Sequence, residues 1–281
     1  MRTALLTAAL LVATLVPGSS SADVASDAVP DLPALPPPSE SGGAAANAER
    51  DEAATAEDDA APGSGDELSP ASTTDAKAPA VRYAAMTAKA CEAALLERGV
   101  RFVKTGPTKG VVDPVRLTAP IRGVSFHSML PPSQRKTSPY EIYDCRLVLA
   151  LDDFAALLAK HEVVDVVHYS VYRPPPKKWP EGTPGKRHGA ALAIDAATFK
   201  KKDGTVLNVE KDFHGRVGRR PCGKGATLWP ATPQAKELRA IVCETADARL
   251  FNVALTPGYN WQHRNHLHLE LTPKVQWILV R

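Results

Sequence analysis

The sequence is poor in cysteine and has no long apolar run beyond its first residues. Only four of its 281 residues are cysteine. No two of them stand at the C-x₂₋₄-C spacing of structural zinc sites, which excludes a metal site built from cysteine pairs. No segment after residue 22 reaches the roughly 18 consecutive apolar residues that a transmembrane helix requires. We therefore expect a chain with no transmembrane segment, whose cysteines serve a purpose other than metal binding.

The N-terminal residues have the order of a secretory signal peptide. Arg2 supplies a short basic region, residues 4–16 form an apolar run too short to span a bilayer, and Ser20 and Ala22 supply the small residues of a cleavage site. An amphipathic N-terminal helix is the alternative, but no polar face interrupts the apolar run. Residues 1–22 are thus predicted to be a signal peptide of a secreted or periplasmic protein.

Residues 23–80 consist mostly of Ala, Pro, Ser, Gly, Asp and Glu, with almost no large apolar side chains. Such a segment cannot bury enough apolar surface to offset the conformational entropy lost on folding. We predict a disordered linker over these residues, with a functional acidic tail as the alternative. The folded domain is then expected over residues 81–281.

Charge is divided unequally between the linker and the domain. Residues 1–80 hold 3 Lys and Arg against 13 Asp and Glu, so that of the totals of 34 and 31 the remaining 31 and 18 lie in residues 81–281, a net charge of +13. A basic domain favours an anionic partner, and peptidoglycan or another cell-wall polymer, nucleic acid or a membrane surface would each satisfy it. The alternative is a surface of solvated Lys and Arg side chains.

All four cysteines lie in the predicted domain, at Cys91, Cys145, Cys222 and Cys243. An even number of cysteines in an exported protein predicts two disulfides. Three pairings are possible, and the order along the chain favours Cys91–Cys145 and Cys222–Cys243.

Helical and strand patterns are mixed along the domain. Helices are expected where apolar residues recur at helical spacing, and strands where β-branched and apolar residues follow one another. The predicted helices cover residues 84–98, 152–160 with Asp152 as N-cap, and 233–247. The predicted strands cover residues 100–103, 146–151, 163–171, 190–199, 205–209, 251–255 and 267–271. This pattern indicates an α+β fold with a mainly antiparallel sheet and flanking helices.

The last predicted strand concentrates imidazoles on one face. His266 and His268 alternate with Leu267 and Leu269, and successive strand side chains point to opposite faces. The two leucines should therefore enter the core, while the two imidazoles project together from the other face. This arrangement suits one metal ligand beside one catalytic base.

His188 and Asp195 form the other half of the predicted site. Seven residues separate them, an odd number that would place them on opposite faces of one flat strand. We therefore expect His188 in the loop before the strand, with Gly189 permitting the bend and Asp195 projecting toward it. Zinc bound by two His and one Asp, with its fourth position open, is the catalytic rather than the structural pattern.

These residues carry a resemblance to a known group of proteins. The pattern His188-Gly189-x-Ala191-x-Ala193-x-Asp195 with His266-x-His268 resembles the zinc peptidases that include D-Ala-D-Ala dipeptidases and carboxypeptidases, murein endopeptidases and the hedgehog N-terminal domain. Within this group, residues 90–271 resemble the bacterial extensin-like C-terminal family. The matching positions are Cys145, Tyr172-Arg173, His188 to Phe199, Asp203-Gly204, Cys243, Thr256 to Asn260 and His263 to Leu269.

The resemblance implies a zinc-peptidase-like fold with three zinc ligands, His188, Asp195 and His268. It also implies that His266 is the catalytic base and that Arg173 contacts the substrate or the transition state. The sequence departs from the peptidases at Lys186, where they usually have Ser, and it lacks the Glu-x-Trp-His motif of the dipeptidases. The His266-x-His268 arrangement resembles the endopeptidases instead.

Three functions follow from these features. The leading hypothesis is a secreted, monomeric zinc metallopeptidase that hydrolyses an amide bond in peptidoglycan peptides through an activated water. The alternative is a non-catalytic, zinc-containing domain that binds the cell wall. A secreted nuclease would need a ββα metal motif with a further His or Asn, which we do not find, so no nucleic-acid partner is expected. His263 and Glu270 are interpreted as solvent-facing side chains, and the alternative is that they support the zinc ligands by contact.

Overall fold

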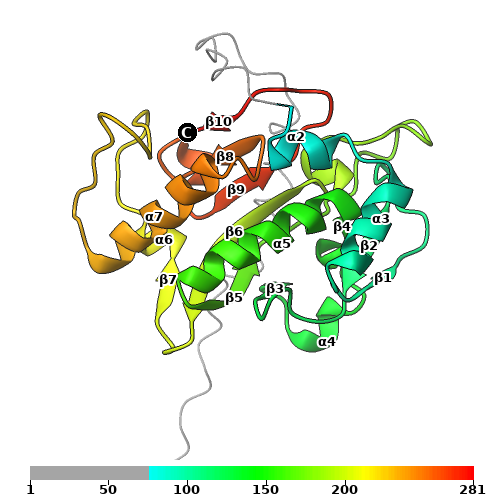
Figure 1. Ribbon diagram of the computed structural model, residues 1–281, viewed down its shortest axis with the longest axis horizontal. Coiled ribbons are helices and arrows are strands. Elements are labelled where there is room, and N and C mark those ends of the chain that lie inside the picture. Colours follow the sequence, from blue (N-terminus) through cyan, green and yellow to red (C-terminus); the bar gives the residue numbers. More distant parts are fainter. Residues whose placement is uncertain (1–75) are drawn as a thin grey trace, which may run out of the picture. The chain divides into compact units, whose positions relative to one another are not determined.

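The computed structural model describes residues 76–281 (Figure 1). The predicted signal peptide and residues 23–75 of the predicted linker lie outside this part. The described helices are α2 (Pro79–Ala84), α3 (Ala88–Glu97), α4 (Pro132–Arg135), α5 (Cys145–Lys160), α6 (Val209–Asp212) and α7 (Pro233–Asp247), with 3₁₀ helices η1 (Pro139–Glu141), η2 (Arg187–Ala190) and η3 (Trp261–His263). None of the helices in this part is long and apolar enough to cross a membrane.

The strands form two sheets. They are β1 (Phe102–Lys104), β2 (Pro114–Leu117), β3 (Ser125–Ser128), β4 (Tyr143–Asp144), β5 (Val163–His168), β6 (Ala193–Lys201), β7 (Val206–Asn208), β8 (Val253–Leu255), β9 (Leu267–Glu270) and β10 (Leu279–Val280). The small sheet has the order β1-β2-β4, and the large one β10-β8-β9-β6-β5-β3, with β7 paired to β6. Most pairs are antiparallel, but β3–β5 and β8–β10 are parallel, so the large sheet is mixed. The predicted α+β class is confirmed.

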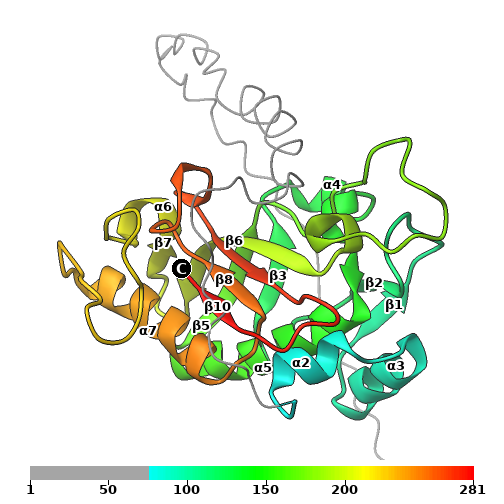
Figure 2. The same cartoon turned by 90° about the horizontal axis from the view of Figure 1, so that it is seen from above.

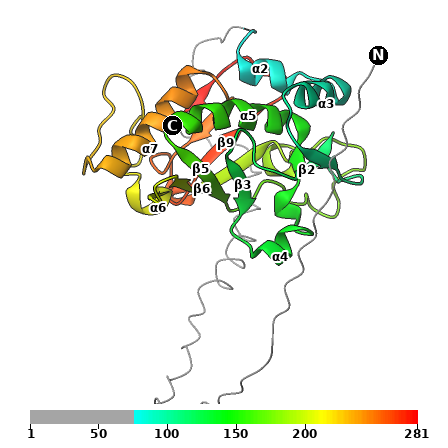
Figure 3. The same cartoon turned by 60° about the horizontal axis from the view of Figure 1, so that its bottom comes forward.

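Helices α5 and α7 cover one face of the large sheet, and the core lies between them and the strands (Figures 1 and 3). The ring of Phe154 in α5 packs edge-on against Phe199 of β6 and Phe251, with centroids 6.4 and 5.8 Å apart. Leu267 and Leu269 of β9 line the same layer as Phe154. The two leucines therefore enter the core, as the alternation predicted, and the other face of β9 is left for polar side chains.

The predicted strand over residues 146–151 is wrong, because these residues belong to helix α5. The helix begins one residue after Asp144, whose carboxylate accepts a hydrogen bond from the Arg146 backbone N–H (3.0 Å) and so acts as the N-cap. Asp152 is a buried residue inside the helix rather than its cap. A helix turn that is buried on all sides shows no apolar period, so its sequence cannot be distinguished from that of a buried strand.

The first predicted helix, over residues 84–98, corresponds to α3, which begins at Ala88. Helix α2 ends at Ala84, and α3 begins after Thr87, whose hydroxyl accepts a hydrogen bond from the Ala90 N–H (3.3 Å). Helix α2 also starts before the predicted domain boundary at residue 81. Its Ala80 N–H donates to the Arg249 carbonyl (3.1 Å), so this helix is part of the folded unit.

Both disulfides form with the pairing that the chain order favoured. Cys91–Cys145 joins α3 to the start of α5, and Cys222–Cys243 joins the loop before α7 to that helix. They close segments of 54 and 21 residues, and each stabilises the fold by about 3–4 kcal/mol through the entropy removed from the unfolded chain. Disulfides are typical of proteins in oxidising compartments.

Candidate metal centre

Strands β6 and β9 bring two of the predicted ligands together. Asp195 and His268 are direct cross-strand partners in the antiparallel pair, and Figure 2 shows β6 and β8, which flank β9, running along the middle of the sheet. Cross-strand partners project from the same face with Cβ atoms about 5 Å apart. Because Leu267 and Leu269 face the helices, Asp195 and His268 both point to the opposite face.

His188 reaches the same place from the loop before β6, as predicted. It lies in η2, between Lys186 and the start of the strand. The bend does not depend on Gly189, however. The residues with left-handed backbone are Arg187 (φ 48°) and Ala191 (φ 53°), and the Ala191 N–H donates to the His188 carbonyl (3.0 Å). This short turn fixes the side chain of His188 above the sheet.

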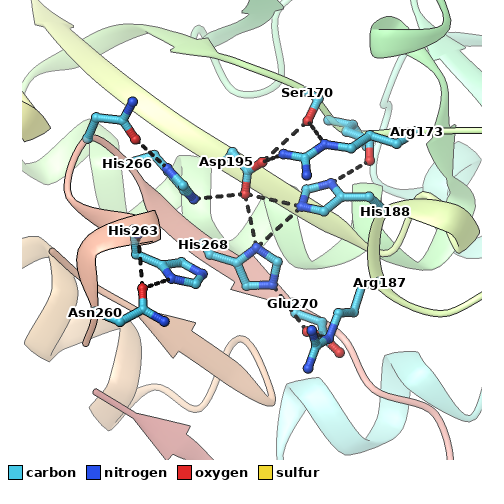
Figure 4. Close-up of polar contacts among 12 residues, drawn as sticks. Ser170, Arg173, Arg187, His188, Asp195, Asn260, His263, His266, His268 and Glu270 are labelled. Atoms are coloured by element: carbon cyan, nitrogen blue, oxygen red, sulfur yellow. Dashed lines mark hydrogen bonds and ion pairs between the residues drawn. The ribbon is translucent and has the colours of Figure 1, made fainter. Parts of the chain in front are cut away.

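The three predicted ligands converge on one point (Figure 4). The Asp195 Oδ1 atom lies 3.1 Å from His188 Nε2 and 2.9 Å from His268 Nδ1, and the two nitrogens are 3.3 Å apart. Tetrahedral ligands at the usual zinc bond lengths of about 2.0–2.1 Å are about 3.3 Å from one another. The spacing of these three donor atoms therefore suits a zinc ion with one position left for a further ligand.

The protonation of His188 strengthens this interpretation. Its Nδ1–H donates to the Val171 carbonyl oxygen (2.8 Å), and a carbonyl oxygen can only accept. Burial lowers the pKa of His188, so the ring is neutral and directs the lone pair of Nε2 at the Asp195 carboxylate. A ring lone pair facing a carboxylate oxygen at 3.1 Å is repulsive unless a cation or a proton lies between them.

The other carboxylate oxygen of Asp195 is occupied by protein groups. Oδ2 accepts hydrogen bonds from Arg173 Nη2 and from the Ser170 hydroxyl (3.3 Å), and Arg173 Nε donates to the same hydroxyl (2.9 Å). Burial by itself raises the pKa of Asp195, but the charged groups around the carboxylate, Arg173 among them, hold it well below its usual value. Arg173, predicted to contact the substrate, thus also fixes Asp195 with only Oδ1 directed into the ligand set.

Glu270 fixes the orientation of His268. Its Oε2 accepts a hydrogen bond from His268 Nε2–H (3.2 Å), and its Oε1 accepts one from Thr272 Oγ1 (2.7 Å). The interpretation of Glu270 as solvent-facing is wrong, since the residue is 5% exposed. Burial by itself lowers the pKa of His268, but the hydrogen bonds with Asp195 and Glu270 outweigh it and raise the pKa to about 9.

Two further imidazoles border the cluster. His266 Nε2 lies 3.4 Å from Asp195 Oδ1, and its Nδ1 is bonded to the Asn265 side chain (2.8 Å). Burial lowers the pKa of His266 to about 4 and that of His263 to about 3. His263 was interpreted as solvent-facing, but it is 5% exposed, with its ring centroid 5.1 Å from that of His266.

The arrangement can hold a metal ion next to a neutral imidazole that accepts a proton. Within residues 76–281, His188, Asp195 and His268 are one of two groups whose donor atoms lie close enough to share an ion. His266 and Arg173 are the more accessible members, with side chains 12% and 22% exposed, so solvent reaches the cluster from their side.

From the sequence, a role in supporting the ligands is only the alternative prediction for His263 and Glu270, and no role is predicted for Ser170. The sequence contains a signal for Glu270, because residues 266, 268 and 270 of one strand point to the same face of the sheet. His263 lies outside any predicted strand. Ser170 falls in the strand predicted over residues 163–171, but β5 ends at His168, and the loop after it brings Ser170 to the cluster.

The fold and the cluster together define a disulfide-linked α+β domain with a buried His–Asp centre on its sheet. The chain belongs to the family described as extensin-like protein C-terminus, whose model matches residues 89–281. This match covers nearly the whole described domain and confirms the extensin-like resemblance. No match is found among curated proteins.

Proposed function

We propose that this chain is an exported zinc-dependent peptidase that hydrolyses an amide bond in peptidoglycan peptides. The observation that carries the proposal is the convergence of His188 Nε2, Asp195 Oδ1 and His268 Nδ1 at 2.9–3.3 Å, beside the neutral imidazole of His266. Three ligands with an open position are typical of catalytic zinc, whereas structural zinc is usually enclosed by four protein ligands. The similarity of the site to the zinc peptidases supports the same assignment.

The residues of the site divide the chemistry among them. A zinc ion held there supplies Lewis acidity, which polarises a carbonyl group and acidifies water. His266, kept neutral by burial, accepts the proton of the attacking water on Nε2 and returns it to the leaving amine. Arg173 holds Asp195 in place, and its guanidinium supplies positive charge near the developing oxyanion.

The substrate class follows from charge and compartment. Residues 81–281 carry a net charge of +13, which favours an anionic polymer. The two disulfides favour a compartment outside the cytoplasm. Peptidoglycan is an anionic polymer in that compartment and contains amide bonds accessible to an exported peptidase.

The direct test is hydrolysis of isolated peptidoglycan. The full chain, stripped of metal and reloaded with zinc, should release new amino groups, and His266→Ala should lower the rate at least 100-fold, since general acid–base catalysis contributes about 10²–10⁴. His214→Ala, outside the cluster, is the matched control and should behave as the wild type. Equal rates for the wild type and His266→Ala would exclude the catalytic role.

The same experiment distinguishes the proposed enzyme from the alternative, a non-catalytic domain that binds the cell wall. That alternative predicts one zinc per chain and sedimentation with insoluble peptidoglycan, but no release of amino groups at any metal concentration. The buried position of the donor atoms is compatible with it, and the accessible His266 and Arg173 favour the enzyme.

A further inference from the structure

A second group of imidazoles adjoins the proposed zinc site. His263, His266 and His268 each present a donor nitrogen, and these atoms lie within 4.8 Å of one another. His268 belongs to both groups. Figure 4 shows the rings of His263 and His266 on the side of His268 that faces away from His188.

The tautomer of His263 is fixed by the local fold. Asn260 is the N-cap of η3, and its Oδ1 accepts the backbone N–H of His263 (3.1 Å), which identifies this atom as the amide oxygen. The same oxygen lies 2.7 Å from His263 Nδ1, so Nδ1 must carry the proton. The lone pair of His263 is therefore on Nε2, which points toward His268 in Figure 4.

His266 presents its lone pair in the same way. Its Nδ1 lies 2.8 Å from the Asn265 amide oxygen and donates to it, so in the neutral ring the lone pair is on Nε2, which lies 3.4 Å from Asp195 Oδ1. An imidazole that donates one N–H to a fixed acceptor and offers its other nitrogen is the usual form of a metal ligand. Two neighbouring residues share this form; His263 is 5% exposed and the side chain of His266 is 12% exposed.

We propose that His263 and His266 form a second divalent-metal position beside the zinc site, for zinc or another ion that prefers imidazole. When His268 is engaged on the first ion, the second position has two protein ligands and completes its shell with water. It therefore fills only at higher metal concentration than the first. The consequence for activity rests on the proposed function: an ion on Nε2 of His266 removes the catalytic base, so that excess zinc inhibits.

Metal stoichiometry tests the second position without reference to activity. The metal-free full chain is dialysed against rising zinc concentrations, and zinc per chain is measured by mass spectrometry. The wild type should bind one ion and then a second, and His263→Ala should weaken the second at least tenfold and retain the first. His188→Ala should show the opposite loss.

A control addresses the surface group of His161, which lies near Glu237 and Glu244 and could bind zinc by itself. His161→Ala should retain both ions. A single ion at saturation, an unchanged second ion in His263→Ala, or loss of the second ion in His161→Ala would each overturn the proposal.

Activity gives a separate readout. For each variant, the ratio of hydrolysis at high zinc to that at low zinc should fall well below one in the wild type and stay near one in His263→Ala. If the chain hydrolyses nothing, the proposed function fails, and the stoichiometry still decides the second metal position. If hydrolysis occurs but the ratio stays near one in the wild type, the inhibitory role of this position is excluded.

Discussion

Asp152 and Asp195 are both 1% exposed, but they differ in how many of their carboxylate oxygens are paired with a guanidinium group. Asp152 Oδ2 accepts from Arg98 Nη1 (2.9 Å) and Oδ1 accepts from Arg122 Nε (2.8 Å), so that guanidinium groups face both oxygens. Arg173 occupies only one oxygen of Asp195, and the other faces three imidazoles. The first cluster is neutralised by its own side chains, whereas the second needs a cation to complete it.

The difference shows why burial alone does not identify a site. Both aspartates are paired with groups of opposite charge, as a stable buried carboxylate must be. What distinguishes Asp195 is the presence of unprotonated ring nitrogens, above all His188 Nε2, that point at a carboxylate oxygen. If Asp152 lies in a closed ion-pair cluster and Asp195 in an open ligand set, substitutions in the two clusters should differ in their effects on zinc binding and on stability.

The largest effect is expected from Asp195→Asn. The amide has nearly the same shape but no charge, and it offers zinc a much weaker ligand between two imidazoles. Zinc content after dialysis should fall from one ion per chain to none, measured by mass spectrometry. Asp152→Asn, the matched control, should keep its zinc, and retention of zinc by the Asp195 variant would contradict the assignment.

Asp152→Ala should have the opposite effect, a loss of stability that does not depend on zinc. It takes the buried carboxylate from Arg122 and leaves Arg98 with Asp153 and Tyr83 as side-chain partners, and we expect a loss of about 2–3 kcal/mol in the free energy of unfolding. This is less than for a fully buried pair, because the Arg122 side chain is 48% exposed. Denaturant titration should give the same loss with and without zinc. A loss that appears only in the zinc-loaded protein would mean that the two clusters are coupled.

Glu270→Gln should weaken zinc binding about 10–100-fold, because the neutral amide is a weaker acceptor for His268 Nε2–H and makes Nδ1 a less basic ligand. Competition with a chromophoric chelator measures this affinity. Glu244→Gln is the control, since that carboxylate is 47% exposed and contacts only the surface residue His161 among the described ion pairs. Equal zinc affinity in both variants would remove Glu270 from the site.

The smallest expected effect is the release of a proton when zinc binds. In the metal-free protein the pKa of His268 is about 9, so at about pH 7.5 zinc must displace a proton from Nδ1. Titration calorimetry in buffers of different ionisation enthalpy should detect about one proton released per zinc, and none above about pH 10. No release near neutral pH would show that His268 is already neutral.

The raised pKa of His268 also makes the stability of the metal-free domain depend on pH. The folded pKa of His268 lies above the unfolded value of about 6.5, so the stabilisation from its proton is fully present below about pH 6.5. It is lost as pH rises through about 9. The midpoint of denaturant unfolding should fall over this window without zinc and less so with zinc bound. A midpoint that stays level without zinc would contradict the raised pKa of His268.

Much of the fold was readable from local pattern. Helix α7 has the predicted bounds, because its apolar residues follow the helical period and Thr232 caps its first turn. The strand alternation of residues 266–269 also predicted which side chains enter the core. The prediction of a strand at the start of helix α5 is wrong, because burial on all sides removes the apolar period that distinguishes a helix from a strand.

The sequence by itself determined the chemistry available at the site: the ligand types, the parity that puts His266 and His268 on one face, and the need for a loop at His188. Only the tertiary structure decided which atoms meet. The pairing of β6 with β9 sets Asp195 opposite His268, and the Asn260 cap and the Ser170–Arg173 contact bring in residues that lie outside the strands. The physical reason is that alternation within a strand is a local property of the backbone, whereas the convergence of donor atoms depends on register between segments about 70–80 residues apart.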